Sequence, residues 1–167
     1  ALDLIGFGDS SKPNSQILYE EKTFENFNYC FDNWSQQVND FCNEIIKKPV
    51  LLIGNSIGGV IALNTSKQLS QNCLGVILID CAQRTMDDKR LAEQSILMRL
   101  LRPVIKTLVR QRILSSNLFK NAAKPAFIEK ILRVAYPSGN NVDEELIDML
   151  FKPTQGKGAP EAFRGFI

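Results

Sequence analysis

The sequence predicts an α/β protein in which a parallel β-sheet fills the first half and an all-helical block follows. Three observations lead to this fold class. The apolar run 50–53 predicts a buried strand that turns at once, around Ser56, into an apolar helix. A second apolar run, 74–80, follows that helix, and strand–helix–strand order is typical of a parallel sheet. After Arg84 strand signals stop and helical periodicity takes over.

Composition places the chain among soluble globular proteins. It has 167 residues, of which 44% are hydrophobic and 23% charged, enough for one core and too apolar for a disordered protein. No apolar run reaches the length of a membrane-spanning helix, and no signal peptide is visible. Because Ala1 already lies in a strand-like segment, we expect the beginning of the natural protein to be missing.

The elements before the central strand are expected as follows. Residues 1–5 predict a strand, 6–13 a turn-rich loop at the rim of the sheet, and 14–28 further loop. An amphipathic helix then begins at Phe31 and ends before Pro49. Its apolar face consists of Phe31, Trp34, Val38, Phe41, Cys42, Ile45 and Ile46.

The turn around Ser56 has the pattern Gly-x-Ser-x-Gly-Gly, with Gly54, Gly58 and Gly59. A strand that turns directly into a helix holds the serine in a strained conformation with its hydroxyl exposed, and such a turn tolerates little bulk. We expect Gly59 to let the helix approach the strand. A dinucleotide-binding loop fits less well, because Ser56 stands where the middle glycine is required. A phosphate loop fails because Val60 stands where lysine is required.

Cysteine and histidine usage restricts the chemistry. Cys30, Cys42, Cys73 and Cys81 form no Cys-x-x-Cys pair, so we expect no metal site and no redox motif, only reduced and mostly buried thiols of an intracellular protein. The chain contains no histidine. A serine nucleophile needs a neighbouring base near neutral pH, and histidine is the usual one.

The second half predicts helices only. Residues 1–83 have a net charge of −4 and residues 84–167 a net charge of +6, so the two halves present different surfaces. Asn141 and Glu144 resemble a capping box. The expected helices are 91–101, one beginning at Pro103, one beginning at Pro125, one after Asn141 and one beginning near Pro160.

A row of basic residues marks one helix of this block. Arg99, Arg102, Lys106 and Arg110 recur at steps of three and four. A solvated outer face explains them without a ligand; the alternative is a peripheral contact with an anionic lipid surface. Nucleic-acid binding is not expected, because no aromatic residues are interleaved with the basic ones.

Four segments together resemble the α/β-hydrolase superfamily, and within it the pheophytinase-like and related hydrolases of cyanobacteria and plastids. They are Asp3-Leu4-Ile5-Gly6-Phe7-Gly8-Asp9-Ser10-Ser11-Lys12-Pro13, the helix around Asp32-Asn33-Trp34 to Cys42, the turn Gly54–Gly59 and the strand ending at Asp80. The resemblance implies a partial hydrolase sheet over 1–83 and an all-helical cap insertion over 84–167.

The resemblance also implies site residues. Ser56 would be the nucleophile and the backbone N–H of Ile57 one donor of the oxyanion hole. The second donor would lie before Ala1, and the catalytic acid and histidine would lie beyond Ile167. Asp80 is expected to be a turn or N-cap residue rather than the catalytic acid. No cofactor is implied.

Two functions remain open. In the first, the chain is the central piece of a serine hydrolase acting on a lipophilic or amphipathic ester; in the second, it is a non-catalytic, hydrolase-like binding module or an inactive fragment. A location in the cytoplasm, or in a plastid if the protein is eukaryotic, is expected. Because a sheet of about three strands has open edges, the isolated chain is also expected to aggregate or to fold only in part.

Overall fold

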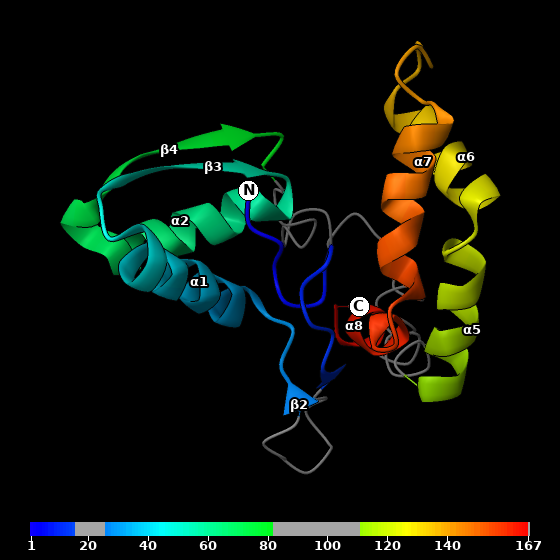
Figure 1. Ribbon diagram of the computed structural model, residues 1–167, viewed down its shortest axis with the longest axis horizontal. Helices are drawn as coiled ribbons and strands as arrows, with labels where there is room; N and C mark the ends of the chain where they lie inside the picture. Colours follow the sequence, from blue (N-terminus) through cyan, green and yellow to red (C-terminus); the bar gives the residue numbers. More distant parts are fainter. Residues whose placement is uncertain (16–25, 82–110, 167) are drawn as a thin grey trace, which may run out of the picture. The chain divides into compact units, whose positions relative to one another are not determined.

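The computed structural model describes residues 1–15, 26–81 and 111–166, which form two compact units (Figure 1). Residues 30–81 form the sheet unit. Residues 3–15, 26–29 and 111–166 form the helical unit. This grouping differs from the boundary expected after residue 83, because the N-terminal segment belongs with the C-terminal helices. The assignment of hydrolase core and cap to 1–83 and 84–167 stays a prediction.

The sheet unit contains the predicted strand, turn, helix and strand. Strand β3 (Val50–Asn55) is followed by helix α2 (Ile57–Leu69), a short 3₁₀ turn η2 (Ser70–Asn72) and strand β4 (Cys73–Ile79). The two strands are parallel, and Ile53 lies opposite Ile77. The parallel pair predicted from the two apolar runs is therefore confirmed. Among the described residues, β3 and β4 pair only with each other.

Helix α1 (Phe31–Asp40) packs on α2, and α2 in turn packs on both strands (Figure 1). It continues as a π-helix, η1 (Phe41–Ile46), and ends at Lys47, whose φ of 54° is left-handed. The predicted helix before Pro49 is thus confirmed, but two residues of its expected apolar face, Ile45 and Ile46, are 67% and 37% exposed and do not pack in the core. Trp34 is 1% exposed and lies in the core of this unit. The buried hydroxyl of Thr65 donates to the carbonyl of Ser35 at 3.3 Å, so α1 and α2 are also joined by a hydrogen bond.

Alternate side chains of β3 point away from α2. Leu51 and Ile53 are 52% and 63% exposed, and on β4 the side chains of Ile77 and Ile79 are about half exposed. Since successive residues of a strand face opposite sides of a sheet, these four side chains form one apolar face, called here the open sheet face.

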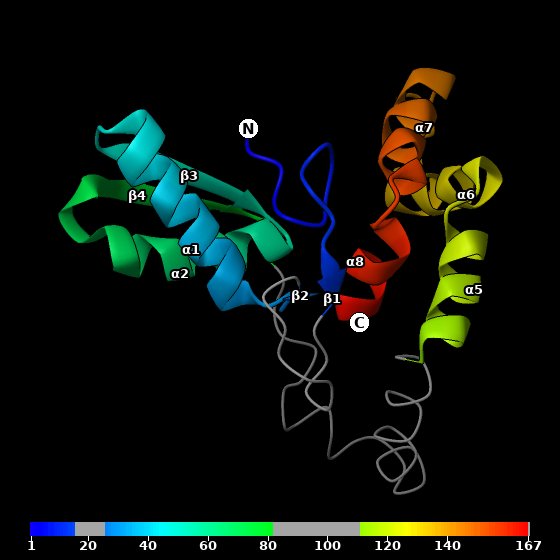
Figure 2. The same cartoon turned by 60° about the horizontal axis from the view of Figure 1, so that its bottom comes forward.

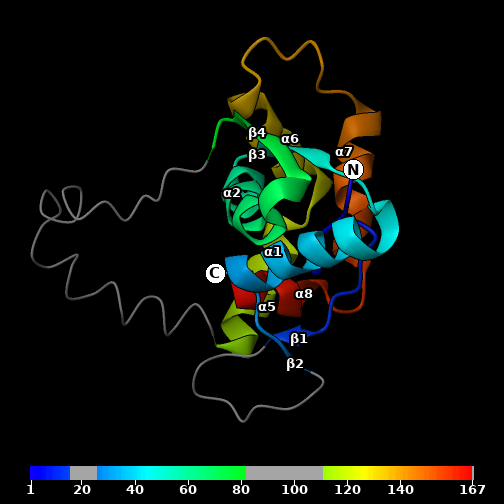
Figure 3. The ribbon, with the colours of Figure 1, turned by 90° about the vertical axis from the view of Figure 1, so that its left-hand side faces the viewer.

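The helical unit begins with two short parallel strands, β1 (Asn14–Ser15) and β2 (Asn26–Phe27). The helices of this unit are α5 (Arg112–Ala122), α6 (Pro125–Ala135), α7 (Glu144–Phe151), the 3₁₀ turn η3 (Lys152–Gln155) and α8 (Ala159–Phe166). Helix α8 packs against β1 and α5, and α6 packs against α7 (Figures 2 and 3). None of the helices in the described ranges is long and apolar enough to cross a bilayer.

A buried polar network joins the N-terminal segment to α8. The guanidinium of Arg164, 2% exposed, pairs with Glu161 at 3.0 Å and donates to the carbonyl of Ser15 at 3.2 Å. Glu161 also accepts from the hydroxyl of Ser15 at 3.0 Å. Nearby, the hydroxyl of Tyr29 donates to the carbonyl of Pro13 at 2.6 Å. These contacts, between residues far apart in sequence, explain why the N-terminal segment belongs to the helical unit.

Several local expectations were wrong. Residues 1–5 form no strand, and the segment expected as loop contains β1 and β2. Helices α6 and α8 are confirmed at Pro125 and next to Pro160, and α7 is confirmed after Asn141. The N-cap of α7, however, is Asp143, whose carboxylate accepts from the N–H of Leu146 at 2.8 Å, so the capping box is wrong. The helices expected over 91–101 and from Pro103 lie outside the described residues.

The four cysteines are free thiols, as expected, but only Cys42 is buried. Burial, and to a smaller degree the neighbouring Cys73, raises the pKa of the Cys42 thiol. Cys30, Cys73 and Cys81 are partly exposed. The expectation of mostly buried thiols therefore holds only for Cys42.

Candidate active site

Ser56 lies at the junction of β3 and α2, where the backbone reverses from strand into helix. Its φ and ψ are 52° and −119°, a conformation that non-glycine residues rarely adopt. Two hydrogen bonds hold it: the N–H of Ser56 donates to the carbonyl of Ile79 at 3.0 Å, and the N–H of Gly59 donates to the carbonyl of Ser56 at 3.0 Å. The residue is exposed. The strained, exposed serine expected from the sequence is therefore present.

A second serine, Ser70, has nearly the same backbone conformation as Ser56 but lies at the opposite end of α2. Ser70, at the carboxyl end of α2, has φ and ψ of 50° and −118°, nearly those of Ser56. It follows the helix, however, where carbonyl groups concentrate negative potential, whereas Ser56 precedes the helix, where N–H groups concentrate positive potential. Only Ser56 is thus placed to have a developing anion stabilised by α2.

The glycines of the turn have different structural roles. A Cβ on Gly54 would overlap the carbonyl of Gly58, so position 54 has no room for a side chain. A Cβ on Gly59 would lie 2.8 Å from the sulfur of Cys81, so Gly59 permits the close approach of α2 to the segment that follows β4. A Cβ on Gly58 would meet nothing within 4 Å. The expectation that the turn tolerates little bulk is therefore right at Gly54 and Gly59 and wrong at Gly58.

Ile57 is the first residue of α2. In the described part of the chain its N–H has no backbone acceptor, as is usual in the first turn of a helix. A donor at this place, directly after the serine, can bind an oxyanion formed when the serine attacks a carbonyl group.

Asp80 follows β4 directly and is exposed. Because the N–H of Ser56 donates to the carbonyl of Ile79, Asp80 is next to the residue that Ser56 contacts. Its φ of 41° is left-handed, a conformation that aspartate tolerates better than most residues. The expectation of a turn residue is consistent with this geometry.

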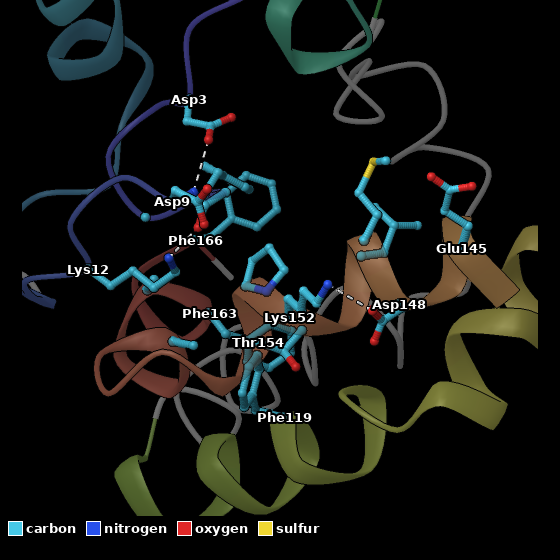
Figure 4. A pocket seen from close by; sticks show the side chains of 18 residues that line it. Asp3, Asp9, Lys12, Phe119, Glu145, Asp148, Lys152, Thr154, Phe163 and Phe166 are labelled. Atoms are coloured by element: carbon cyan, nitrogen blue, oxygen red, sulfur yellow. Dashed lines mark hydrogen bonds and ion pairs between the residues drawn. The ribbon is translucent and has the colours of Figure 1, made fainter.

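The helical unit contains a pocket that sequence reasoning missed (Figure 4). Its volume is about 810 Å³, and it lies among the loop 3–12, α5, α7, η3 and α8. Four phenylalanine side chains contribute to its wall: Phe7 packs edge-on against Phe166 at 5.9 Å between ring centres, and Phe119 lies 5.5 Å from Phe163. Cavities of this size with apolar walls are typical of small-molecule sites.

The charged groups of the pocket are largely held by neighbours. The ammonium of Lys12 donates to the carbonyls of Gly8 and Ser10 at 2.6 and 3.1 Å. Lys152 pairs with Asp148 at 2.9 Å, and Asp3 accepts from the N–H of Asp9 at 2.9 Å (Figure 4). The wall left for a ligand is therefore mainly apolar.

The signal for this pocket in the sequence is weak. The pattern of the loop 6–13 predicts a connection at the rim of a sheet, and the aromatic residues that meet this loop come from helices more than a hundred residues later. The basic row Arg99, Arg102, Lys106 and Arg110 lies outside the described residues. Ser56, Ile57 and the three glycines all lie in the sheet unit, whereas the pocket lies in the helical unit.

Comparison with known proteins supports the interpretation of the turn. The family described as the alpha/beta hydrolase fold matches residues 1–119. A curated protein, the chloroplastic pheophytinase of Arabidopsis thaliana, is 33% identical over 75 residues, which are 45% of this chain and 14% of that protein. No solved structure matches. With a family match over more than half its length and a serine held between strand and helix, the chain belongs to the α/β-hydrolase fold family.

Proposed function

We propose that the protein is a serine hydrolase that cleaves an ester of an apolar or amphipathic substrate, with Ser56 as its nucleophile. The observation that carries this proposal is the position of Ser56: exposed, strained, and directly before the amino end of α2. Membership of the hydrolase family and the similarity to a protein named as a pheophytinase support a hydrolytic reaction. The chloroplast location in that protein's name agrees with the plastid alternative for this one.

The geometry of the turn supports the following reaction. The Oγ of Ser56 attacks the carbonyl carbon of the ester while its proton passes to a base, and the carbonyl oxygen becomes an oxyanion. The N–H of Ile57 donates to that oxyanion. Collapse of the intermediate breaks the bond to the alcohol, which leaves with the proton from the base. Water then hydrolyses the acyl-serine and restores Ser56.

The base is a histidine outside these 167 residues, since the chain contains none. The matched relative is far longer than the matched segment, so the proposed activity is that of a longer protein. The pocket of the helical unit supports the apolar substrate class, because its volume of about 810 Å³ and its phenylalanine walls suit an acyl chain or a ring system.

A second function is favoured by one observation, the absence of histidine. Without a base the serine has negligible nucleophilicity, and the chain would then be a non-catalytic binding module that keeps a hydrolase-like turn. The pocket of the helical unit would serve such a module equally well.

Reaction with a fluorophosphonate probe distinguishes the two functions. The probe is applied to the full-length product of the reading frame, to its Ser56→Ala variant and to Ser70→Ala, the matched control with the same backbone conformation. We expect labelling of the unmodified protein and of Ser70→Ala, and none of Ser56→Ala. Absence of labelling in all three would exclude a reactive Ser56 and favour the binding module.

A further inference from the structure

Two carboxylates that line the pocket of the helical unit are not held by neighbouring side chains. Asp9 lies in the N-terminal loop and Glu145 in the first turn of α7, and both line the cavity of about 810 Å³ (Figure 4). Both residues are exposed, and in the described part of the chain no lysine or arginine pairs with either of them. Asp3 and Asp148, by contrast, interact with the N–H of Asp9 and with a lysine. The carboxylates of Asp9 and Glu145 can therefore bind a ligand.

The side chains that line this pocket carry a negative net charge. They include four acidic and two basic residues, a net charge of −2, whereas the whole chain has a net charge of +2. The pocket is therefore more acidic than the composition of the chain predicts. Of the basic residues, Lys12 donates to two carbonyl groups and Lys152 pairs with Asp148. An anionic ligand is repelled by this set of charges and a cationic ligand is attracted.

Two aromatic rings of the wall lie near Asp9. Phe7, two residues before Asp9, packs edge-on against Phe166, and the two residues are 37% and 45% exposed. A ligand can therefore contact part of each ring. The face of a phenyl ring attracts a cation, so an ammonium group that contacts both a ring and a carboxylate is stabilised by both. Phe119 and Phe163 lie apart from Asp9 and Phe166 (Figure 4) and form an apolar wall.

We propose that this pocket binds an amphipathic molecule whose polar end is a cationic amine or a quaternary ammonium group. The ammonium group contacts the ring pair of Phe7 and Phe166 and the carboxylate of Asp9. The apolar body of the molecule packs against the second phenylalanine pair. Glu145, on the other side of the cavity, adds to the negative potential (Figure 4).

Binding in this pocket does not rest on the proposed reaction. All of its lining residues belong to the helical unit, whereas Ser56 belongs to the sheet unit. One further step does rest on the proposed function: if the protein is the proposed hydrolase, the ester that it cleaves carries a cationic group. A non-catalytic module would bind the same class of ligand.

Isothermal titration calorimetry of the full-length Ser56→Ala variant tests the proposal, because this variant lacks the proposed nucleophile. The probes share a decyl chain and differ in the head group: decyltrimethylammonium, decanol and decanoate, each below the concentration at which it forms micelles. We expect decyltrimethylammonium to bind about ten-fold more tightly than decanoate, and decanol to bind with an intermediate affinity. This preference should decrease as the ionic strength is raised.

Variants that remove one charge locate the binding site. In the Ser56→Ala protein, Asp9→Asn should lower the affinity for decyltrimethylammonium about five-fold and Glu145→Gln about two-fold, and neither should change the affinity for decanol. Asp32→Asn and Glu144→Gln are the matched controls, because each removes the same charge at an exposed position that does not line the pocket. Both controls should bind all the probes as the Ser56→Ala protein does.

Phe166→Leu tests the contact between the ammonium group and the aromatic rings. The variant loses the ring but keeps an apolar side chain, so the affinity for decyltrimethylammonium should fall about three-fold while the affinity for decanol stays the same. Circular dichroism checks that the variant folds. If it does not fold, Asp9→Asn, at an exposed loop position, replaces it.

Three results would overturn the proposal. They are binding of decanoate as tight as that of decyltrimethylammonium, no binding of any of the probes, and equal losses of affinity in the control variants. Because Ser56 is absent from these measurements, they are independent of the labelling by fluorophosphonate. Failure of the pocket proposal and failure of the proposed reaction are therefore distinguishable.

Discussion

The backbone of Ser56 is held in a conformation that costs about 1–3 kcal/mol for a residue with a side chain. The surroundings compensate for this cost through two hydrogen bonds and the close packing of Gly54 against Gly58. Position 54 therefore carries the steric constraint that keeps the serine raised above the end of β3. If the turn is the nucleophile turn of a hydrolase, this constraint is part of the catalytic apparatus.

Substitution of the two flanking glycines tests this constraint. Gly54→Ala should lower the free energy of unfolding by about 3 kcal/mol, because the added methyl group overlaps the carbonyl of Gly58. Gly58→Ala is the matched control: its methyl group meets open space, and alanine favours the helix, so stability should stay the same or rise by up to about 1 kcal/mol. Urea denaturation of the full-length protein measures both. Equal losses would show that the turn is not restricted at position 54 in particular.

Tyr29 gives the helical unit a sensitivity to alkaline pH. Burial, and to a smaller degree the charge of Glu161, raises the pKa of Tyr29 to about 12, above the ordinary value of 10. The folded protein therefore keeps the phenol protonated while the unfolded chain loses the proton. The contribution of the protonated Tyr29 phenol to the free energy of unfolding is complete below pH 10, and it is lost as the pH rises from 10 to 12.

Comparison with Tyr29→Phe isolates this contribution. Below pH 10 the variant should be less stable by about 1 kcal/mol, because the hydrogen bond to Pro13 is lost. The difference in unfolding free energy should then shrink between pH 10 and 12, since phenylalanine does not ionise. Tyr136→Phe, at a half-exposed position, serves as the control and should follow the unmodified protein throughout. A constant difference between Tyr29→Phe and the unmodified protein would contradict the assignment.

At the scale of the element, α7 depends on a single side-chain cap. Asp143→Ala removes the acceptor of the Leu146 N–H and should lower the stability of the helical unit by about 1 kcal/mol. The sequence favoured Asn141 for this role, but Asn141 lies two residues before the observed cap. Asn141→Ala is therefore the control and should change stability by less than about 0.5 kcal/mol. Thermal denaturation measures the stability of both variants. A larger loss in Asn141→Ala than in Asp143→Ala would show that Asn141 is the N-cap, as the sequence predicts.

The elements that could be predicted are those whose signals are local. The run 50–53 lies in β3 and 74–79 in β4, the Gly54–Gly59 turn has the expected strain at Ser56, and Pro125 begins α6. Each depends on hydrophobic periodicity or on one residue of special backbone geometry. The candidate nucleophile could thus be identified from the sequence alone.

The elements that could not be predicted depend on distant contacts. Residues 1–5 have strand composition, yet they form no strand in the structure. The loop that follows them contributes Phe7 to the pocket wall. There Phe7 contacts Phe166, which lies near the other end of the chain. Pairing of Ser15 with Glu161 likewise has no local signal. Propensity yields to tertiary contacts of this kind, and a single sequence does not reveal them.

At the scale of the whole molecule, the open sheet face is an exposed apolar surface on the described part of the chain. Leu51, Ile53, Ile77 and Ile79 are about half exposed, and within the described residues neither β3 nor β4 has a second neighbouring strand. Exposed apolar strands with free edges pair readily with other chains. The 167-residue chain in isolation should therefore aggregate, whereas a longer product that covers this face should not.

Light scattering of the isolated chain and of the full-length product tests this difference, and a lysine substitution locates its origin. Ile53→Lys places a charge on the open sheet face and should reduce aggregation of the isolated chain, because edge and face charges oppose intermolecular pairing. Ile113→Lys, at an 81% exposed position of α5, is the matched control and should have little effect on aggregation.

In the full-length product we expect the opposite effect. There Ile53→Lys should lower the soluble yield, because the charge would be buried. A monomeric isolated chain with a cooperative thermal transition would contradict the expectation and show that the sheet unit is complete with two strands.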